Sequence, residues 1–357
     1  MVVNKADVRR YAPRFVLTIN GVDLSPQVSH AVTGLEISQQ LNRNSSFSCR
    51  VQDSYDGFDF RWLGSPLFKY GNEVSIAIGY SNLLLPALEG TIQNIAPEFV
   101  SGTAPSFSFG GSDRGYTYLT TESESRTFRD TRDSDIVRQI AKDAHLQAVV
   151  DQTSRSVEER MKASGGTYLE FIRLMARQNN YQFRLSGRRL YFQRRSGNLK
   201  PVMTLTWGKD LISFRPELST EQTVTKVIVR ARDPVNKETI EGSATAGDER
   251  QRAGGARPAS KVVRESQGER VRLINNQPVR STDEANELAL SELENSSENF
   301  MTGSAELIGA PELWPGACVM LAGLGKWFSG IYSIERATHR IDAQGYRTSL
   351  ELKRNAL

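Results

Sequence analysis

Two segments of the chain, 245 residues apart, carry the same glycines and prolines at the same spacing. The matched positions are Gly64 with Gly309, Pro66 with Pro311, Gly71 with Gly316, Val74 with Val319, and Ala77 with Ala322. Glycine and proline make up only about 7% and 5% of ordinary sequences, so a shared set in one register is improbable by chance. A further glycine followed by a strand-like stretch recurs at Gly90 and at Gly330. The sequence therefore predicts one supersecondary unit that occurs twice.

Both repeat segments show the alternation that is typical of β-strands. The stretch from Val74 to Ile78 has period-two character, and short stretches of this kind are separated by turns such as Asn20-Gly21. This punctuation favours a barrel or a sandwich. A register slip of one residue would exchange core and surface faces, so Val74 and Val319 should be equivalent and buried in two related β-barrels. The alternative is a chance similarity of two hairpins.

The hydrophobic period changes between the two repeat segments. Apolar residues from Ile136 to Ala144 fall on one face of a helix, and Thr167 and Glu170 have the capping-box spacing that begins a second helix. Strand-like stretches on either side of Ser186-Gly187 indicate a β-hairpin. The middle of the chain is therefore predicted to be a small α+β domain.

These patterns predict a mainly β protein with an α+β insertion, divided into three domains. The first β-barrel domain covers residues 1–110, and the small α+β domain, with two helices and a hairpin, covers 111–200. The second β-barrel domain covers 201–357, and its strands at 201–235 could be shared with the first barrel. Residues 243–260 contain no aromatic residue and no Leu, Ile or Val, which predicts a mobile, exposed loop. A helix is expected near 282–295, after the capping residue Ser281.

The sequence offers little material for catalysis or metal binding. It has three histidines and two cysteines, and no two histidines have the spacing of a metal site. Cys49 and Cys318 are far apart and are predicted to be buried thiols. The stretch from Gly323 to Lys326 resembles part of a phosphate loop but lacks its first glycine and its final Ser or Thr. We therefore predict no catalytic residue, no metal and no cofactor.

The charge pattern argues against a dedicated nucleic-acid or membrane protein. The formal net charge of +4 is spread along the chain, and no apolar stretch approaches the roughly 18 residues of a membrane helix. The stretch from Arg184 to Arg195 interleaves arginines with aromatic residues and could stack on single-stranded nucleic acid. However, Tyr181, Phe183 and Leu185 share one strand face, which favours a core position for them and a solvated one for the arginines.

The second repeat segment and the stretch after it carry a longer motif. It reads as a proline-glycine turn, a strand, a Gly-x-Gly loop, a Ser-Gly-x-Tyr strand, a histidine and a Gly-Tyr-x-Thr strand. The residues that form it are Pro311, Trp314, Pro315, Gly316, Val319, Gly323, Gly325, Gly330, Tyr332, His339, Gly345, Tyr346 and Thr348. With this motif the chain resembles the late control protein D family of phage tail hubs. That family is similar in its hub part to the valine-glycine repeat protein G of type six secretion.

The resemblance implies a structural baseplate hub of a contractile phage tail or a phage-tail-like injection system. It implies a homotrimer whose six barrels form a ring, joining the sixfold tail tube, or a tube initiator protein, to a trimeric spike. Because the chain stops at Leu357, soon after the last strand, the spike is expected to be a separate protein. A baseplate wedge or tape-measure protein could also bind, and DNA or cargo could pass through the channel.

The expected location is the virion tail baseplate or an equivalent particle, assembled in the bacterial cytoplasm. Two other functions stay open at this point: a tail-associated cell-wall hydrolase and a nucleic-acid-binding tail component. A hydrolase would need a catalytic acid, a nucleophile or a metal, for which the sequence has no motif. A nucleic-acid-binding component would bind through the basic hairpin, and its affinity would fall steeply with salt.

Overall fold

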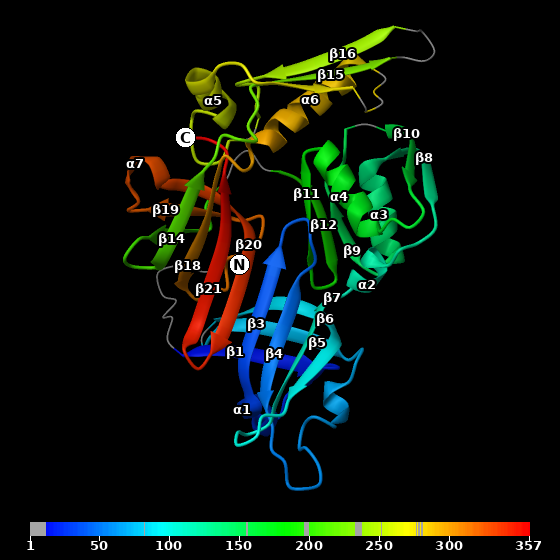
Figure 1. Ribbon diagram of the computed structural model, residues 1–357. Helices are drawn as coiled ribbons and strands as arrows, with labels where there is room; N and C mark the ends of the chain where they lie inside the picture. Colours follow the sequence, from blue (N-terminus) through cyan, green and yellow to red (C-terminus); the bar gives the residue numbers. More distant parts are fainter. Residues whose placement is uncertain are drawn as a thin grey trace.

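The computed structural model of the protein describes residues 12–357, except residues 82, 155, 196–199, 233–237, 251, 276, 278 and 280. Antiparallel strands dominate, so the expected mainly β fold with an α+β insertion is confirmed. In Figure 1 the first barrel lies at the bottom, the second barrel at the left, the middle domain at the right and a smaller insertion at the top.

The first barrel is an open, curved sheet with the strand order β3-β4-β7-β6-β5-β1. Its elements are β1 (Pro13–Ile19), β2 (Val22–Asp23), α1 (Pro26–Ala31), β3 (Val32–Gln40), β4 (Ser46–Gln52), η1 (Pro66–Phe68), β5 (Glu73–Tyr80), β6 (Leu83–Glu98) and β7 (Ser106–Asp113). Alternate residues of β5, such as Val74 and Ile76, are buried, and Phe68, Phe107 and Phe109 pack edge to face or tilted beside them. Each such side chain contributes about 1.5–3 kcal/mol when fully buried.

The second barrel has the same neighbour order in the same chain order. Its elements are β13 (Met203–Thr206), β14 (Leu211–Leu218), β18 (Met301–Ile308), β19 (Cys318–Ala322), α7 (Gly325–Phe328), β20 (Gly330–Asp342) and β21 (Gly345–Arg354). The path β14-β18-β21-β20-β19-β13 corresponds strand for strand to β3-β4-β7-β6-β5-β1. The one difference in direction is that β13 pairs parallel to β19, whereas β1 pairs antiparallel to β5. Cys49 and Cys318 are both buried and free.

Two β-bulges recur at corresponding places in the two barrels. The pairing shifts by one residue after Val32 in β3 and after Leu211 in β14. It shifts again after Ile92 in β6 and after Ile334 in β20. A bulge leaves one residue unpaired and bends and twists its strand. Bulges at matching positions therefore indicate that the two sheets bend at equivalent places.

The bulges also fix how the two repeat segments correspond. Val74 pairs with Gly90, two residues before the first barrel's β6 bulge, and Val319 pairs with Tyr332, two residues before the β20 bulge. Val74 and Val319 therefore occupy the same rung, and both are buried. The later glycines do not correspond, because Gly90 matches Tyr332 and not Gly330.

The middle domain is larger than two helices and a hairpin. Its elements are α2 (Tyr116–Thr120), β8 (Arg126–Arg132), α3 (Asp133–Asp143), β9 (Gln147–Val150), β10 (Ser156–Lys162), α4 (Tyr168–Gln178), β11 (Tyr181–Ser186) and β12 (Arg189–Arg194). The hairpin β11-β12 gains β9 as a parallel third strand, and β8 pairs with β10. Tyr181, Phe183 and Leu185 are buried, while Arg184 stacks on Tyr191 on the opposite face.

A further α+β unit is inserted between β14 and β18. Its elements are β15 (Lys226–Arg232), β16 (Thr239–Thr245), α5 (Ala259–Gln267), β17 (Val271–Ile274) and α6 (Thr282–Ser297). Glycine at 242 lets β16 lie directly on α6, because a Cβ there would come within 2.4 Å of the Ala285 backbone. The strands expected at 201–235 are therefore not shared with the first barrel: β13 and β14 join the second barrel and β15 joins the insertion. Residues 233–235 lie outside the described residues.

The exposed loop expected over 243–260 is wrong. Its first residues complete β16, its last begin α5, and Ala253 between them is buried. The backbone N–H of Ala253 donates to Asn355 Oδ1 at 2.7 Å, and that of Arg250 donates to Glu294 Oε1 at 2.6 Å. The composition of this segment wrongly predicted an exposed loop, because alanines and backbone hydrogen bonds, and not large apolar side chains, hold the segment in place. Residue 251 lies outside the described residues.

Deleting residues 247–257 should therefore lower the melting temperature by several degrees. The deletion removes the two-way backbone pairing between Arg257 and Leu357 and the contact of Ala253, and each lost hydrogen bond costs about 0.5–1.5 kcal/mol. Differential scanning calorimetry measures the change. A matched shortening of the exposed turn 101–103 should leave the melting temperature within about a degree. An unchanged melting temperature in the 247–257 variant would contradict this packing.

Candidate assembly interface

The two barrels are joined inside the chain by strand pairing. The second half of β20, after its bulge, pairs antiparallel with β3, from Arg336 opposite Gln40 to Asp342 opposite Gly34. The Arg336 guanidinium donates to Gln40 Oε1 at 2.6 Å across this junction. The result is one continuous sheet that runs through both barrels.

Two strand edges in the described part of the chain correspond to these joined edges but pair with nothing. The second half of β6, the counterpart of β20, pairs only with β7, and β14, the counterpart of β3, pairs only with β18. Unpaired edges present backbone N–H and C=O groups that can pair with another chain. No pattern in the sequence predicts these unpaired edges, because strand neighbours depend on contacts between distant segments.

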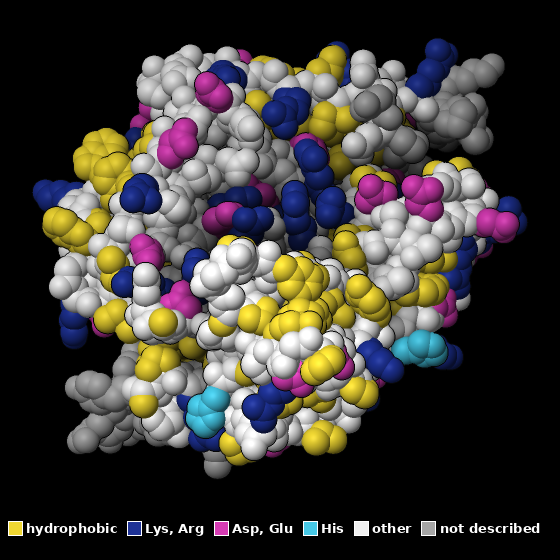
Figure 2. Space-filling view, turned by 60° about the horizontal axis from the view of Figure 1, so that its bottom comes forward, with side chains coloured by type: hydrophobic (Ala, Val, Ile, Leu, Met, Phe, Trp, Pro, Cys, Tyr) yellow, Lys and Arg dark blue, Asp and Glu magenta, His cyan; other side chains and the backbone are white. Residues whose placement is uncertain are grey.

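Large apolar side chains are exposed next to both edges. Ile212 and Leu218 lie on β14, and Trp207, which is 62% exposed, lies just before it. Phe99 and Val100 follow the end of β6 and are 63% and 51% exposed. Figure 2, which brings the bottom of Figure 1 forward, shows hydrophobic side chains gathered over the first-barrel end. Contiguous exposed apolar side chains mark interaction surfaces more often than scattered ones do.

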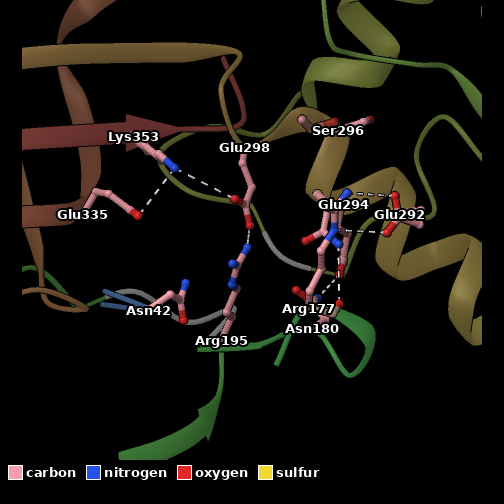
Figure 3. Close-up of polar contacts among 12 residues, drawn as sticks. Asn42, Arg177, Asn180, Arg195, Glu292, Glu294, Ser296, Glu298, Glu335 and Lys353 are labelled. Carbon is pink, nitrogen blue, oxygen red and sulfur yellow. Dashed lines mark hydrogen bonds and ion pairs between the residues drawn. The ribbon is translucent and has the colours of Figure 1, made fainter. Parts of the chain in front are cut away.

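A charged network fixes the middle domain against α6 and the second barrel (Figure 3). Arg195, just after β12, pairs with Glu298 at the end of α6. Lys353 of β21 lies 3.5 Å from Glu335 and 4.0 Å from Glu298. Burial lowers the pKa of Arg195, and the carboxylates of Glu335 and Glu294 oppose this change. Breaking such a partly buried pair would leave an uncompensated charge, so the network stabilises the contact between the middle domain and the second barrel.

A second cluster of polar contacts tightens the same junction. Arg177 of α4 lies 3.4 Å from Glu292 of α6, and Asn180 donates to Glu294. Figure 3 shows both contacts beside the Arg195 network, and Figure 2 shows Lys and Arg side chains gathered in a hollow at the centre of its face. The sequence analysis did not single out these residues. Their partners come from segments more than a hundred residues away, which no local pattern reveals.

The motif residues His339, Tyr346 and Thr348 meet in one buried hydrogen-bond network. His339 Nε2 lies 3.1 Å from the Leu313 carbonyl oxygen, to which it donates. Nδ1 is then an acceptor and lies 2.8 Å from the Tyr346 hydroxyl and 3.1 Å from Thr348 Oγ1. Thr348 Oγ1 also accepts from the Ala310 backbone N–H at 3.0 Å. The network holds the loop before β19 against the second barrel.

The other motif residues serve turns, core and a small cavity. Val319 and Tyr332 are core residues, and the Gly330 Cα lies directly beneath the Arg354 guanidinium. A cavity of about 190 Å³ is lined by residues of both barrels and of the β11 end, among them Pro311, Trp314 and Pro315. The motif glycines with positive φ are Gly316, Gly323, Gly325, Gly330 and Gly345.

In the first repeat segment the glycines and prolines likewise serve turns. Pro66 begins η1 and Gly71 has φ +81°, whereas Gly64 faces open space. Ala77 lies on β5 beside the register shift that follows Ile76.

Within the described part of the chain, no three His, Cys, Asp or Glu side chains are grouped so that they could hold a metal ion. No helix formed by the described residues is both long enough and apolar enough to span a membrane.

Comparison with known proteins identifies the family. The family described as the Alg8 N-terminal domain matches this chain over residues 11–343. The chain belongs to this family. No curated protein matches the chain in sequence at a significant level.

Solved structures with similar folds come from tails and secretion systems. The 43 kDa tail protein of prophage MuSo2 from Shewanella oneidensis is 16% identical, with a TM-score of 0.74 over 96% of this chain and 98% of that chain. A tail protein from Neisseria meningitidis MC58 is 12% identical, with a TM-score of 0.70 over 96% and 97%. An E. coli type VI secretion component, described as similar to the T4 tail proteins gp27 and gp5, is 12% identical, with a TM-score of 0.57 over 95% and 77%. The resemblance to tail hubs is thus confirmed as a likeness of fold.

The buried His339 should make stability depend on pH. Burial lowers its pKa from 6.5 to about 4, so the unfolded chain takes up the proton first as pH falls. The neutral, buried His339 therefore adds to the free energy of unfolding. This addition is fully present above pH 6.5 and decreases by about 3 kcal/mol as the pH falls to 4.

Comparing wild type with His339→Gln by urea unfolding from pH 7 to pH 4 measures this contribution. The variant is less stable at pH 7, and the difference should narrow by about 3 kcal/mol at pH 4. Burial raises the pKa of Asp113 to about 7. Because Asp113 is present in both proteins, its effect on the pH dependence of stability cancels in the comparison. Parallel pH profiles would contradict a buried neutral histidine.

Proposed function

We propose that this chain is a structural hub in the baseplate of a contractile phage tail or a related injection particle, where three copies close into a ring of six barrels. The observation that carries the proposal is the correspondence between the joined and the free strand edges. The edge that β20 offers to β3 within the chain is offered again by β6, and the edge of β3 is repeated by β14. The fold likeness to tail proteins supports the same reading.

Repetition of one junction makes a closed ring. If β6 of one copy joins β14 of the next as β20 joins β3, every step from barrel to barrel is equivalent, and three copies supply six barrels. The contact is head-to-tail between different surfaces, which is the kind that closes rings. The middle domain and the insertion occur once per chain, so they would carry threefold contacts while the barrels carry sixfold ones.

The bulges fix which residues would face each other between copies. Counting from them, Glu98 would lie opposite Arg215 of the next copy, as Arg340 lies opposite Glu36 within the chain. Ile95 would likewise face Leu218. In the junction within the chain the arginine lies on β20 and the glutamate on β3, whereas between copies the glutamate would lie on β6 and the arginine on β14. Both pairs are of opposite charge, which favours correct pairing and register.

One rung of the proposed junction would lack backbone donors. Pro97 of β6 would lie opposite Pro216 of β14, and proline has no N–H. Prolines on edge strands discourage unwanted pairing of isolated chains. The junction would therefore rest on the remaining rungs and on side chains, and it would form best when a partner brings the copies together.

The proposed partners follow from the symmetry. The sixfold tail tube or its initiator would bind the barrel ring, and a threefold spike would bind the singly occurring domains. A wedge or tape-measure protein could attach, DNA or cargo could pass through the ring, and assembly would take place in the bacterial cytoplasm. The work is done by interfaces, without catalysis. The alternative of a nucleic-acid platform on the β11-β12 hairpin is not favoured, because Tyr181 and Phe183 are buried and cannot stack on bases.

Reversing one charge at the junction should weaken ring formation, and reversing both should restore it. Glu98→Arg or Arg215→Glu places like charges opposite each other and should weaken association by about tenfold, while the double variant should recover most of it. Native mass spectrometry and sedimentation measure the oligomer, and Glu98→Gln controls for the in-chain ion pair with Arg50. A stable hexamer, or a monomer within an assembled particle, would contradict the trimer.

A further inference from the structure

The loop between β4 and β5 is much longer than its counterpart in the second barrel. It runs from residue 53 to residue 72, whereas the loop between β18 and β19 runs from 309 to 317. The extra residues are 53–63, which we call the aromatic finger. It projects from the first barrel at the bottom of Figure 1.

The aromatic finger is an ordered structure with an exposed tip. The Asp53 carboxylate accepts the backbone N–H groups of Ser54, Trp62 and Leu63, which closes the base of the finger. The Asp56 carboxylate accepts from the backbone of Phe58 and Asp59 and shapes the tip. These contacts order the base and the tip of the finger.

Aromatic side chains line one side of the finger but do not cover its tip. The ring of Phe60 lies between those of Tyr55 and Phe99, with centroid distances of 4.8 Å and 5.3 Å. The Phe58 side chain, in contrast, is 96% exposed. A fixed, fully exposed phenylalanine is costly in water unless a partner covers it.

The counterpart loop of the second barrel shows where such a loop packs. It contacts the turn end of the β5-β6 hairpin in the neighbouring first barrel: Tyr80 donates to the Gly309 carbonyl at 2.8 Å and its ring lies against Tyr346. Pro311 and Trp314 share a cavity lining with Ile78 and with residues 86 and 87. In the second barrel the corresponding hairpin end is residues 323–329, which include α7.

This hairpin end carries an apolar patch with basic neighbours. Trp327 of α7 and Trp207 are both more than 60% exposed, and a Cβ on Gly323 would lie 3.6 Å from the backbone nitrogen of Trp207. Lys326 directly precedes Trp327, Lys209 follows Trp207 by two residues, and both lysines are exposed. We call Trp207, Lys209, Lys326 and Trp327 the tryptophan patch.

We propose that the aromatic finger of one copy docks on the tryptophan patch of the next copy in the ring. Residues 64–72, which correspond to loop 309–317, would approach the hairpin end of the next copy as that loop does within the chain, and the finger extends from them; the contact therefore rests on the proposed ring. Phe58 meets the two tryptophans, and Asp56 and Asp59 meet Lys209 and Lys326. The complementary charges and the shared geometry select a second copy of this chain as the occupant.

Cysteine cross-linking in the concentrated protein tests this contact. The variant Phe58→Cys with Trp327→Cys should form covalent species that stop at a trimer, because three copies close the ring. Cys49 and Cys318 are buried, so they should not form cross-links. The pair Phe58→Cys with Val271→Cys, which places the second thiol on the insertion sheet, is the matched control and should not link. The pair Ala96→Cys with Glu217→Cys reports the strand-edge junction itself.

A second measurement follows association without cross-links. Phe58→Ser should weaken association by about tenfold, and Met161→Ser, which alters an exposed apolar side chain of the middle domain, should not. Thermal melting of both variants should match wild type, since neither side chain is buried. Added salt should weaken association less in an Asp56→Asn, Asp59→Asn variant than in wild type.

The outcomes separate the finger contact from the ring. A 58–327 link above the control, together with weaker association of Phe58→Ser, supports the contact. A 96–217 link without a 58–327 link overturns the finger contact and leaves the proposed hub function standing. Absence of both links overturns the finger contact and the ring together.

Discussion

Backbone pairing between β3 and β20 holds the two barrels in one fixed arrangement. Seven rungs of backbone pairing turn two barrels into one sheet. Every buried N–H and C=O in that ladder must keep its partner, so the two barrels cannot rotate independently without breaking several hydrogen bonds. Tyr80 and Arg336 add side-chain contacts across the same junction. Because this junction is rigid, the paired edges of β3 and β20 can serve as a template for how the unpaired edges of β14 and β6 would join.

The register of the repeat could be predicted because it depends on local backbone geometry. Gly71 and Gly316 have φ values of +81° and +88°, a region that other residues rarely adopt, so glycine is retained where the chain turns into the strand. Strand alternation then places Val74 and Val319 without further information. The same reasoning misassigned Gly90, whose match is Tyr332, because the hairpin loops between the two glycine-strand motifs differ in length.

What sequence reasoning missed depends on contacts between distant segments. The 247–257 segment is held by the end of the chain and by α6, and its alanines carry no visible hydrophobic signal. The Arg195, Glu298 and Lys353 network joins three elements whose charges look like ordinary surface charges in a single sequence. An edge of β6 or β14 is free when no other strand pairs with it, and a local sequence pattern does not tell which strands pair. Interfaces therefore stay hidden where turns and cores do not.

The direction of the joining strands has a mechanical consequence. In Figure 1, β3 and the second half of β20 run along the direction that separates the finger end from the insertion end. Antiparallel hydrogen bonds lie perpendicular to their strands, so a force along that direction loads all seven rungs together in shear instead of opening them one after another. A part that must transmit a sudden axial thrust gains most from this arrangement. The same ladder would yield far more easily to a sideways pull that peels one strand from its end.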